Sequence, residues 1–232
     1  RSQSTGLALS RLRKIVVFER LLTRLIHTAP NRWVLKGGLA LDFRLGDRAR
    51  TTKDMDLARQ GDVETALEDL LEAQSLDLGD HFVFRSERGE SPAHDVEIAV
   101  RFRIEAELAG RRFETVLLDI GFSDPALWQP ERIRPPALLD FAGLEPADIP
   151  VRPLEQLIAE KVHAYTRTYA GTRESSRVKD LVDIVLVAAF YELDGARLWT
   201  ALQSSFDSRA THSLPNSLPH PPATWERSYA KL

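Results

Sequence analysis

The hydrophobic pattern of the chain changes at a proline-rich segment, Pro130 to Pro150, which contains five prolines. Before this segment, stretches with the period of a helix alternate with stretches that have the two-residue period of a strand. After it, the pattern is helical. The sequence therefore predicts an α+β fold, with an α/β domain over residues 1–130, a linker over 131–149 and a helical domain over 150–232. Because ligands commonly bind where two domains meet, we expect the helical domain to complete an active-site cleft.

Composition narrows the classes of protein to which the chain can belong. Its 232 residues include no cysteine, which excludes a disulfide scaffold and a cysteine-ligated zinc site. A formal net charge of -3 argues against a globally basic nucleic-acid-binding protein, although a local basic face is sufficient to bind RNA. No apolar run approaches the roughly 18 residues of a membrane span, and the first ten residues lack the pattern of a secretory signal. We therefore expect a cytoplasmic protein with no membrane partner.

The periodic segments predict the order of the elements. Helices are expected over residues 7–27, 39–45, 63–73, 153–169, 175–191 and 195–206. Strands are expected over residues 33–36, 51–57, 81–85, 96–104 and 113–122. After an irregular segment, Ser213–Pro222, the residues Trp225 and Tyr229 are expected to dock as one last helical turn, with a loose tail as the alternative.

A glycine pair directly follows the expected strand Trp33–Lys36, and a helix is expected to follow the glycines. Backbone N–H groups at a helix N-terminus bind phosphate, and glycine allows a phosphate to approach closely. Lys36, Gly37 and Gly38 are therefore candidates for binding nucleotide phosphates. Many strand–helix turns use two glycines without binding a ligand, so this motif alone is weak.

Two aspartates are expected to share one face of the next strand, because side chains alternate along a strand. Asp54 and Asp56 point to that face, while Met55 and Leu57 point to the other. Two neighbouring carboxylates suit Mg²⁺ or Mn²⁺, and Mg²⁺ prefers one or two carboxylates together with substrate phosphates. The alternative is an exposed polar strand face. Because Asp54 follows Gly38 by 16 residues, the order of motifs favours a metal–nucleotide site.

A third metal-binding carboxylate is a candidate on a later strand. Asp119 interrupts an apolar run, where an aspartate is costly unless it is paired or metal-bound. The alternative is an ordinary aspartate at a strand end. Asp95 and Glu97 form a competing pair, which ranks lower because His94 and Arg101 indicate a solvated surface of mixed charge.

The helical part carries charged residues at apolar positions. Lys161 lies in the middle of an apolar helix stripe, where it must reach solvent or meet an anion such as a triphosphate. Asp180 and Asp183 share one face of the next helix, which is expected to be buried nearly all round. Buried acids need cationic partners, and Lys161 is the obvious candidate.

Basic and aromatic residues gather between these helices, in a combination that suits the phosphates and bases of an RNA end. They are Arg167, Arg173, Arg177 and Lys179, with Tyr165 and Tyr169. The basic first helix, with Arg11, Arg13, Lys14, Arg20 and Arg24, is a further candidate for RNA binding. Solvated helix faces are the alternative for each residue taken singly.

Four motifs in this order resemble the AbiEii/MenT nucleotidyltransferase toxins, which belong to the DNA-polymerase-β-like nucleotidyltransferase superfamily. They are WVLKGGLAL from Trp33, RTTKDMDL from Arg50, EKxxA from Glu160 and RxKDxxD from Arg177. The resemblance spans roughly residues 7–206. It implies a mixed sheet flanked by helices, followed by a helical C-terminal half.

The resemblance also implies roles for individual residues. Asp54 and Asp56 would hold Mg²⁺, with Asp119 as a third carboxylate. Lys36, Gly37 and Gly38 would hold the nucleotide phosphates, although the superfamily's usual serine after the glycine is absent here. Lys161 would contact the triphosphate, and Asp183, with Lys179 and Asp180, would complete the active site.

The activity that the resemblance implies is Mg²⁺-dependent transfer of nucleotides from an NTP to the 3′ acceptor end of tRNA, which blocks translation. A cognate antitoxin would restrain the enzyme. In some systems restraint is by phosphorylation of a hydroxyl near the two aspartates, and Thr52 stands at that position here. A phosphate would add about -1.5 to -2 charge and repel both acids and the NTP.

Three other functions remain open from the sequence. The chain is alternatively a non-catalytic nucleotide- or RNA-binding partner on the same fold, although its intact set of acids argues against this. It is alternatively a metal-dependent nuclease that uses the same acids. A last alternative is transfer to protein hydroxyls, including self-modification at Thr51 or Thr52.

Overall fold

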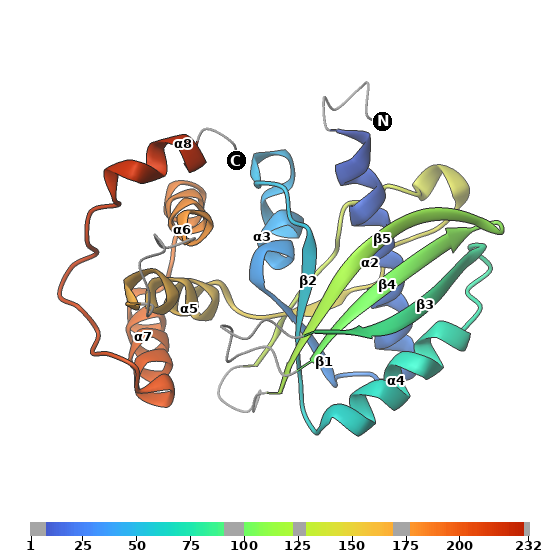
Figure 1. Ribbon diagram of the computed structural model, residues 1–232, viewed down its shortest axis with the longest axis horizontal. Helices are drawn as coiled ribbons and strands as arrows, with labels where there is room; N and C mark the ends of the chain where they lie inside the picture. The colour runs from blue at the N-terminus through green and yellow to red at the C-terminus, as the bar shows by residue number, and fades with distance from the viewer. Residues whose placement is uncertain (1–7, 91–99, 123–128, 169–176, 230–232) are drawn as a thin grey trace. The chain divides into compact units, whose positions relative to one another are not determined.

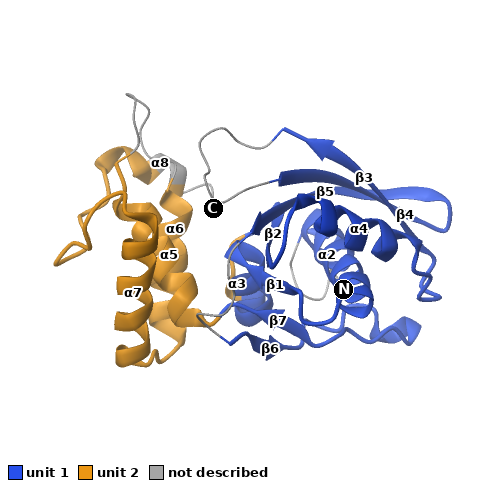
Figure 2. Ribbon diagram, turned by 90° about the horizontal axis from the view of Figure 1, so that it is seen from below, with its two compact units in different colours: residues 1–47, 51–152 blue, residues 48–50, 153–232 orange. Residues whose placement is uncertain are grey.

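The computed structural model describes residues 8–90, 100–122, 129–168 and 177–229. The chain divides into two compact units (Figure 2): unit 1 comprises residues 1–47 and 51–152, and unit 2 comprises residues 48–50 and 153–232. The expected linker, residues 131–149, therefore lies within unit 1. A short segment, residues 48–50, belongs to unit 2 although unit 1 flanks it in the sequence.

Unit 1 alternates helices and strands, as its sequence pattern predicts (Figure 1). Its helices are α2 (Leu9–Thr28), α3 (Gly37–Leu45) and α4 (Val63–Ser75), with short 3-10 turns at Gly46–Arg48 and Asp140–Ala142. Its strands are β1 (Trp33–Lys36), β2 (Asp54–Arg59), β3 (Phe82–Gly89), β4 (Val100–Leu108), β5 (Arg111–Phe122), β6 (Glu131–Ile133) and β7 (Ile149–Val151).

The seven strands form one mixed sheet in the order β3-β4-β5-β2-β1-β7-β6. β2 pairs with β5 in parallel, β1 pairs with β7 in parallel, and the other neighbours are antiparallel. Helices flank this sheet, which confirms the predicted fold class (Figure 1).

One face of the sheet is apolar and forms the core of unit 1. Leu35, Leu57, Ile120 and Val100 oppose one another across β1, β2, β5 and β4, and all four are buried. A one-residue step along each strand reverses the direction of the side chain. The next residues along these strands therefore point to the opposite face, which carries charged groups.

The basic residues of α2 do not form the RNA-binding face expected from the sequence. Arg11, Arg20 and Arg24 are all buried and paired with carboxylates of unit 1. Arg11 donates to Asp42 at 2.8 Å, and Arg24 donates to Asp80 at 2.8 and 2.6 Å. For these three arginines the expectation is wrong, because buried carboxylates bind them inside the fold: Asp42 and Asp80 from distant parts of the sequence, and Glu19 from the same helix. Arg13 and Lys14 are half-buried.

Unit 2 is helical, and its short segment 48–50 packs with these helices. They are α5 (Leu154–Thr166), α6 (Val178–Phe190), α7 (Gly195–Arg209) and a final 3-10 turn and α8 (Glu226–Tyr229). α5 packs against both α6 and α7. The prediction that the helix at 175–191 is buried nearly all round is wrong: α6 buries Val178, Asp183 and Val187, whereas Val185 is 57% exposed.

The predicted last helical turn docks through Trp225 alone, because Tyr229 is 64% exposed. Its ring meets that of Tyr165 at 5.8 Å between centroids, and both pack with Val178. The Tyr165 hydroxyl donates to the carbonyl oxygen of Pro219 at 2.7 Å, which fixes the irregular segment that leads to the turn. No helix among the described residues has the length and hydropathy needed to span a bilayer.

Hydrogen bonds between histidine and threonine side chains connect the loop after α7 to α5. Thr166 Oγ1 lies 2.8 Å from His212 Nε2, and His163 Nε2 lies 2.8 Å from Thr211 Oγ1. Burial lowers the pKa of His212, and the positive charge of Arg167 lowers it further. Burial and the charge of Arg167 therefore favour the neutral form of His212.

Acidification is expected to destabilise unit 2 through His212. Because its pKa is lowered in the folded state, the unfolded chain binds the proton more tightly as the pH falls below about 6.5. Stability that is fully present above this pH is then lost. The urea midpoint should fall less between pH 7.5 and 5.5 in His212→Gln than in the wild type, and the exposed His220→Gln is the control. Equal falls in all three proteins would contradict the prediction.

Candidate active site

Four charged side chains lie in one row across β1, β2, β5 and β4. The strand register pairs Lys36 with Asp56, Asp56 with Asp119, and Asp119 with Arg101. Directly opposed residues share a face of a sheet, so the row lies on the face opposite the core. From β1 to β4, the four groups are a cation, two carboxylates and a second cation.

Asp54 adds a third carboxylate to this face. The burial of β2 alternates over its first four residues: Asp54 and Asp56 are half-buried, whereas Met55 and Leu57 are buried. This confirms the predicted orientation of the two aspartates. Their spacing places two carboxylates side by side next to Asp119.

The first glycine of the pair lies directly against Asp56. Gly37 begins α3 with a φ of 67°, a conformation that side chains rarely adopt, and a Cβ atom at this position would lie 2.1 Å from Asp56 Oδ2. Glycine is therefore required at position 37 for two reasons, backbone conformation and space. Lys36, Gly37 and Gly38 form the end of β1 and the first turn of α3, beside this carboxylate.

Arg101 holds the third carboxylate of the row. Its Nε and Nη2 donate to the two oxygens of Asp119 at 2.6 and 2.5 Å. These hydrogen bonds raise the pKa of Arg101, and the negative charges of Asp119, Asp54 and Asp56 add to the effect against the opposing influence of burial. Arg101 therefore lies in the field of all three acids.

The donor set fits a metal that arrives with a nucleotide. Among the described residues, no group of three or more acidic, histidine or cysteine side chains is arranged to hold a metal ion alone. Asp54 and Asp56 supply two carboxylates, which is the number that Mg²⁺ takes when phosphates and water complete its coordination. Asp119 is held by Arg101 on both oxygens, so its role as a metal ligand stays a prediction.

Unit 2 contains a separate charged cluster, which joins α5 and α6. The Lys161 ammonium lies 2.7 Å from Asp183 Oδ2 and 3.2 Å from Asp180 Oδ1. This confirms Lys161 as the cationic partner of the two helix acids. Arg50 donates to Asp183 at 2.9 and 2.7 Å, and Arg177 lies 3.5 Å from Asp180.

The carboxylates keep Lys161 charged in spite of its burial. Burial by itself lowers the pKa of Lys161, but the charges of Asp180 and Asp183 and its hydrogen bond to Asp183 outweigh this effect and raise the pKa above its ordinary value. The side chain is only 9% exposed. Lys161 is therefore a fixed cation rather than a proton donor near neutral pH.

The other candidate residues are exposed, half-buried or outside the described part of the chain. Lys179 is exposed on α6, and Gly38 is half-buried in the first turn of α3. The candidate residues Asp95, Glu97, Tyr169 and Arg173 lie outside the described part of the chain.

Thr52 precedes β2 and is buried, with 5% of its surface exposed. Its hydroxyl oxygen has no hydrogen-bond partner among the described residues. A kinase acting on Thr52 would therefore need this segment to move. Thr51 beside it is exposed.

Sequence reasoning gave no site role to two arginines that the structure places at the predicted acids. Arg101 was assigned to a solvated surface, but it binds Asp119. Arg50 lies in the motif around the two aspartates, four residues before Asp54, and binds Asp183. Its position inside the RTTKDMDL motif was the available signal.

Comparisons with known proteins bear on the family and the fold of the chain. The family described as nucleotidyl transferase AbiEii toxin, type IV TA system, matches residues 20–231. The solved structure of MenT4, a nucleotidyltransferase toxin from Mycobacterium tuberculosis H37Rv, has a TM-score of 0.64 at 19% identity, covering 99% of this chain and 86% of that chain. A candidate nucleotidyltransferase from Helicobacter pylori has a TM-score of 0.50 at 17% identity, with 91% and 87% covered. At these identities the structures show a shared fold, and comparison with curated proteins gives no match.

Proposed function

Because the chain belongs to the AbiEii family of nucleotidyltransferase toxins of type IV toxin–antitoxin systems, we propose that it is a Mg²⁺-dependent enzyme that transfers nucleotides from an NTP to the 3′ end of tRNA and so blocks translation. The observation that carries the chemistry is the pair Asp54 and Asp56, with Asp56 lying directly against Gly37. A cognate antitoxin and a cytoplasmic location belong to the same proposal.

In the proposed reaction, the 3′-hydroxyl group of the RNA loses its proton to water, and its oxygen forms a bond to the α-phosphorus of the NTP. The bond between the α-phosphorus and the bridging oxygen breaks, and pyrophosphate leaves. Asp54 and Asp56 would hold Mg²⁺ (or Mn²⁺), which neutralises the triphosphate and orients it for in-line displacement when bound. Lys36, Gly37 and Gly38 would bind phosphate oxygens at the start of α3. Positioning and electrostatics supply most of the catalysis in such transfers.

Unit 2 would supply the remaining groups of the proposed site. Lys161 is a buried, permanently charged cation that suits a triphosphate oxygen, and Asp183 and Asp180 hold it in place. Lys179, exposed on the same helix as the acids, is available to a phosphate. Arg167 and Arg177 contribute positive charge to this unit, which supports an RNA acceptor.

The proposal is tested by incubating the purified protein with total tRNA, Mg²⁺ and each NTP in turn, labelled either at the α- or at the γ-phosphate. Nucleotidyl transfer puts only the α-label on RNA and lengthens it by one or more nucleotides. A chelator should abolish the signal. Shortened RNA would show a nuclease instead, and γ-label on RNA or protein would show phosphoryl transfer.

Label on the protein itself, from the α-labelled NTP alone, would contradict the tRNA proposal and identify a protein acceptor. Thr51 is the exposed hydroxyl nearest in sequence to Asp54, so Thr51→Val should then remove the label. Nucleotide binding without label anywhere, with total RNA from the source organism also present, would favour a non-catalytic binding protein.

A further inference from the structure

Arg50 is fixed to unit 2 by a two-point contact with a buried acid. Its Nε and Nη2 lie 2.9 and 2.7 Å from the two oxygens of Asp183, which is a bidentate pair. Asp183 is 3% exposed at its side chain and Arg50 is 11% exposed. An arginine fork matches both carboxylate oxygens at once, which the single ammonium of lysine cannot do.

The segment that carries Arg50 has a second anchor on the same helix. Arg48 stacks over the ring of Phe190 at 4.6 Å, so residues 48–50 contact α6 at two places. The two arginines differ in chemistry, because Arg48 meets an aromatic ring and Arg50 meets a charge. This difference provides a matched control for the role of Arg50.

Among the described residues of this cluster, Arg50, Lys161 and Arg177 supply three positive charges beside the two negative charges of Asp180 and Asp183. Removal of Arg50 would lower the charge of the cluster by one unit and leave Lys161 as the main partner of Asp183.

The two aspartates use two of the three N–H donors of the Lys161 ammonium group. An ammonium group has three donors. Within the described residues its polar contacts are those with Asp180 and Asp183, and its side chain retains a 9% exposed surface. The third donor therefore has no acceptor in the described part of the chain.

We infer that Arg50 is a positioning residue for the triphosphate: it shares and orients Asp183, so that the positive charge and the third donor of Lys161 serve a phosphate oxygen. This inference rests on the proposed function, since it names the anion that the cluster would bind. It assigns to Arg50 an effect on nucleotide affinity through Asp183 rather than a contact with the reacting atoms.

The test measures binding of inorganic tripolyphosphate with Mg²⁺ by calorimetry, because this probe has no base and undergoes no transfer. Arg50→Met is expected to weaken binding roughly 10–30-fold, the scale of one unit charge in a partly buried site. Arg50→Lys keeps the charge but loses the fork, so its loss should be smaller. Arg48→Met, which loosens the same segment without changing the contacts of Asp183, should bind like the wild type.

A double variant separates charge from folding. Arg50→Met with Asp183→Asn removes one positive and one negative charge and so restores the total charge of the cluster, which should recover part of the affinity lost in Arg50→Met alone. Thermal denaturation of every variant checks that the compared proteins are folded. In the transfer assay, Arg50→Met should raise KM for the NTP more than it lowers kcat.

Unchanged affinity in Arg50→Met would overturn the inference, as would an equal loss in Arg48→Met or a wild type that binds no tripolyphosphate. A wild type that binds tripolyphosphate through Arg50 but transfers no nucleotide would support the inference and defeat the proposed function. The two can therefore fail separately.

Discussion

Asp56→Asn is expected to abolish nucleotidyl transfer while leaving the fold intact. Asparagine has the shape of aspartate, so it fits beside Gly37, but it lacks the negative charge that a metal requires. Metal ions contribute several kcal/mol of transition-state stabilisation, and about 1.4 kcal/mol corresponds to a tenfold change in rate. Loss of one of two supporting carboxylates should therefore lower kcat/KM roughly 10³-fold or more.

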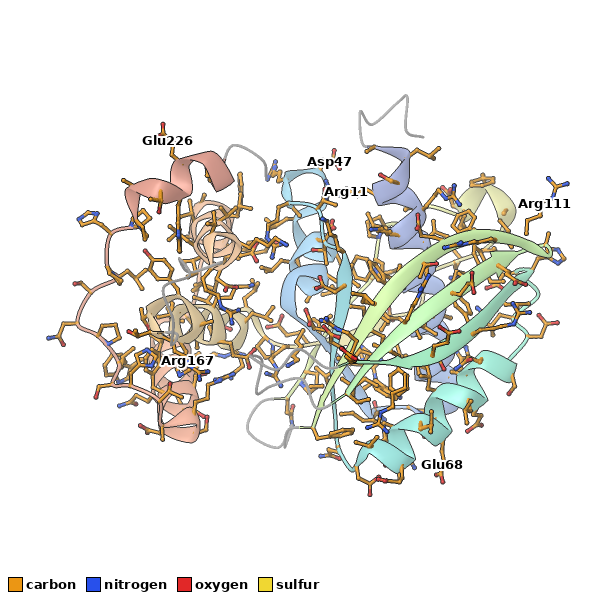
Figure 3. All side chains as sticks on the ribbon, viewed as in Figure 1. Arg11, Asp47, Glu68, Arg111, Arg167 and Glu226 are labelled. Atoms are coloured by element: carbon orange, nitrogen blue, oxygen red, sulfur yellow. The ribbon has the colours of Figure 1, made fainter. Side chains whose placement is uncertain are left out.

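The measurement is the α-label transfer assay, with circular dichroism to show that the variant is folded. Glu68→Gln is the control, because it removes a carboxylate from the exposed side of α4, where Glu68 projects away from the rest of unit 1 (Figure 3). Transfer at the wild-type rate by folded Asp56→Asn would show that this carboxylate is not part of the reaction.

Gly37→Ala tests the role of the Asp56 carboxylate without changing any charge. The added methyl group would lie 2.1 Å from Asp56 Oδ2, and alanine is strained at a φ of 67°. The Asp56 side chain or the start of α3 must therefore move, and transfer should fall even though every charged group is retained. Gly79→Ala, at the same φ of 67° but with open space around it, is the control for backbone strain.

Local features of the fold were predictable because their causes are local. The strand Trp33–Lys36 ends where Gly37 takes a positive φ, and its bounds match the prediction. The helix α4 begins after Asp62, whose side chain accepts the N–H of Thr65 at 2.9 Å. The alternation of Asp54 and Asp56 with Met55 and Leu57 follows from the period of a strand.

Features that depend on distant residues were not predictable in the same way. The partners of Arg11 and Arg24 lie 31 and 56 residues away, so a helix that looks like a basic surface is in fact a set of buried ion pairs. Arg101 meets Asp119 only because β4 and β5 are neighbours in a particular register. For α6 the positions of the apolar residues predicted burial nearly all round, but a sequence pattern does not show how many neighbouring elements are available to cover a helix.

Asp80→Asn is expected to destabilise unit 1 strongly, because it leaves a buried cation without its counter-charge. The side chains of Asp80 and Arg24 are both 0% exposed. Arg24 donates to both oxygens of Asp80 at 2.8 and 2.6 Å, and the N–H of Phe82 donates at 3.0 Å. Breaking one side of such a pair costs about 3–5 kcal/mol of unfolding free energy.

The lowered pKa of Asp80 predicts a second measurable effect of its ion pair with Arg24. Burial by itself raises this pKa, but the donors of Arg24, the N–H of Phe82 and the charges of Arg24 and Arg20 outweigh burial and lower it below 3.8. The pair therefore stabilises the fold above about pH 4, and this contribution is lost as the pH falls through the folded pKa. Asp80→Asn should make the acid side of the stability profile less steep.

A double variant distinguishes an uncompensated charge from a loss of packing. Replacing both partners, as Arg24→Met with Asp80→Leu, removes the charges together, so it should be less destabilising than Asp80→Asn although it deletes more hydrogen bonds. Glu145→Gln, in a pair with Arg134 whose side chains are 64% and 59% exposed, should change stability by no more than about 1 kcal/mol. Urea midpoints followed by two probes measure these differences, since the chain has two units. A double variant less stable than Asp80→Asn would mean that the ion pair stabilises unit 1 through its hydrogen bonds, and that the buried charge of Arg24 is tolerated without Asp80.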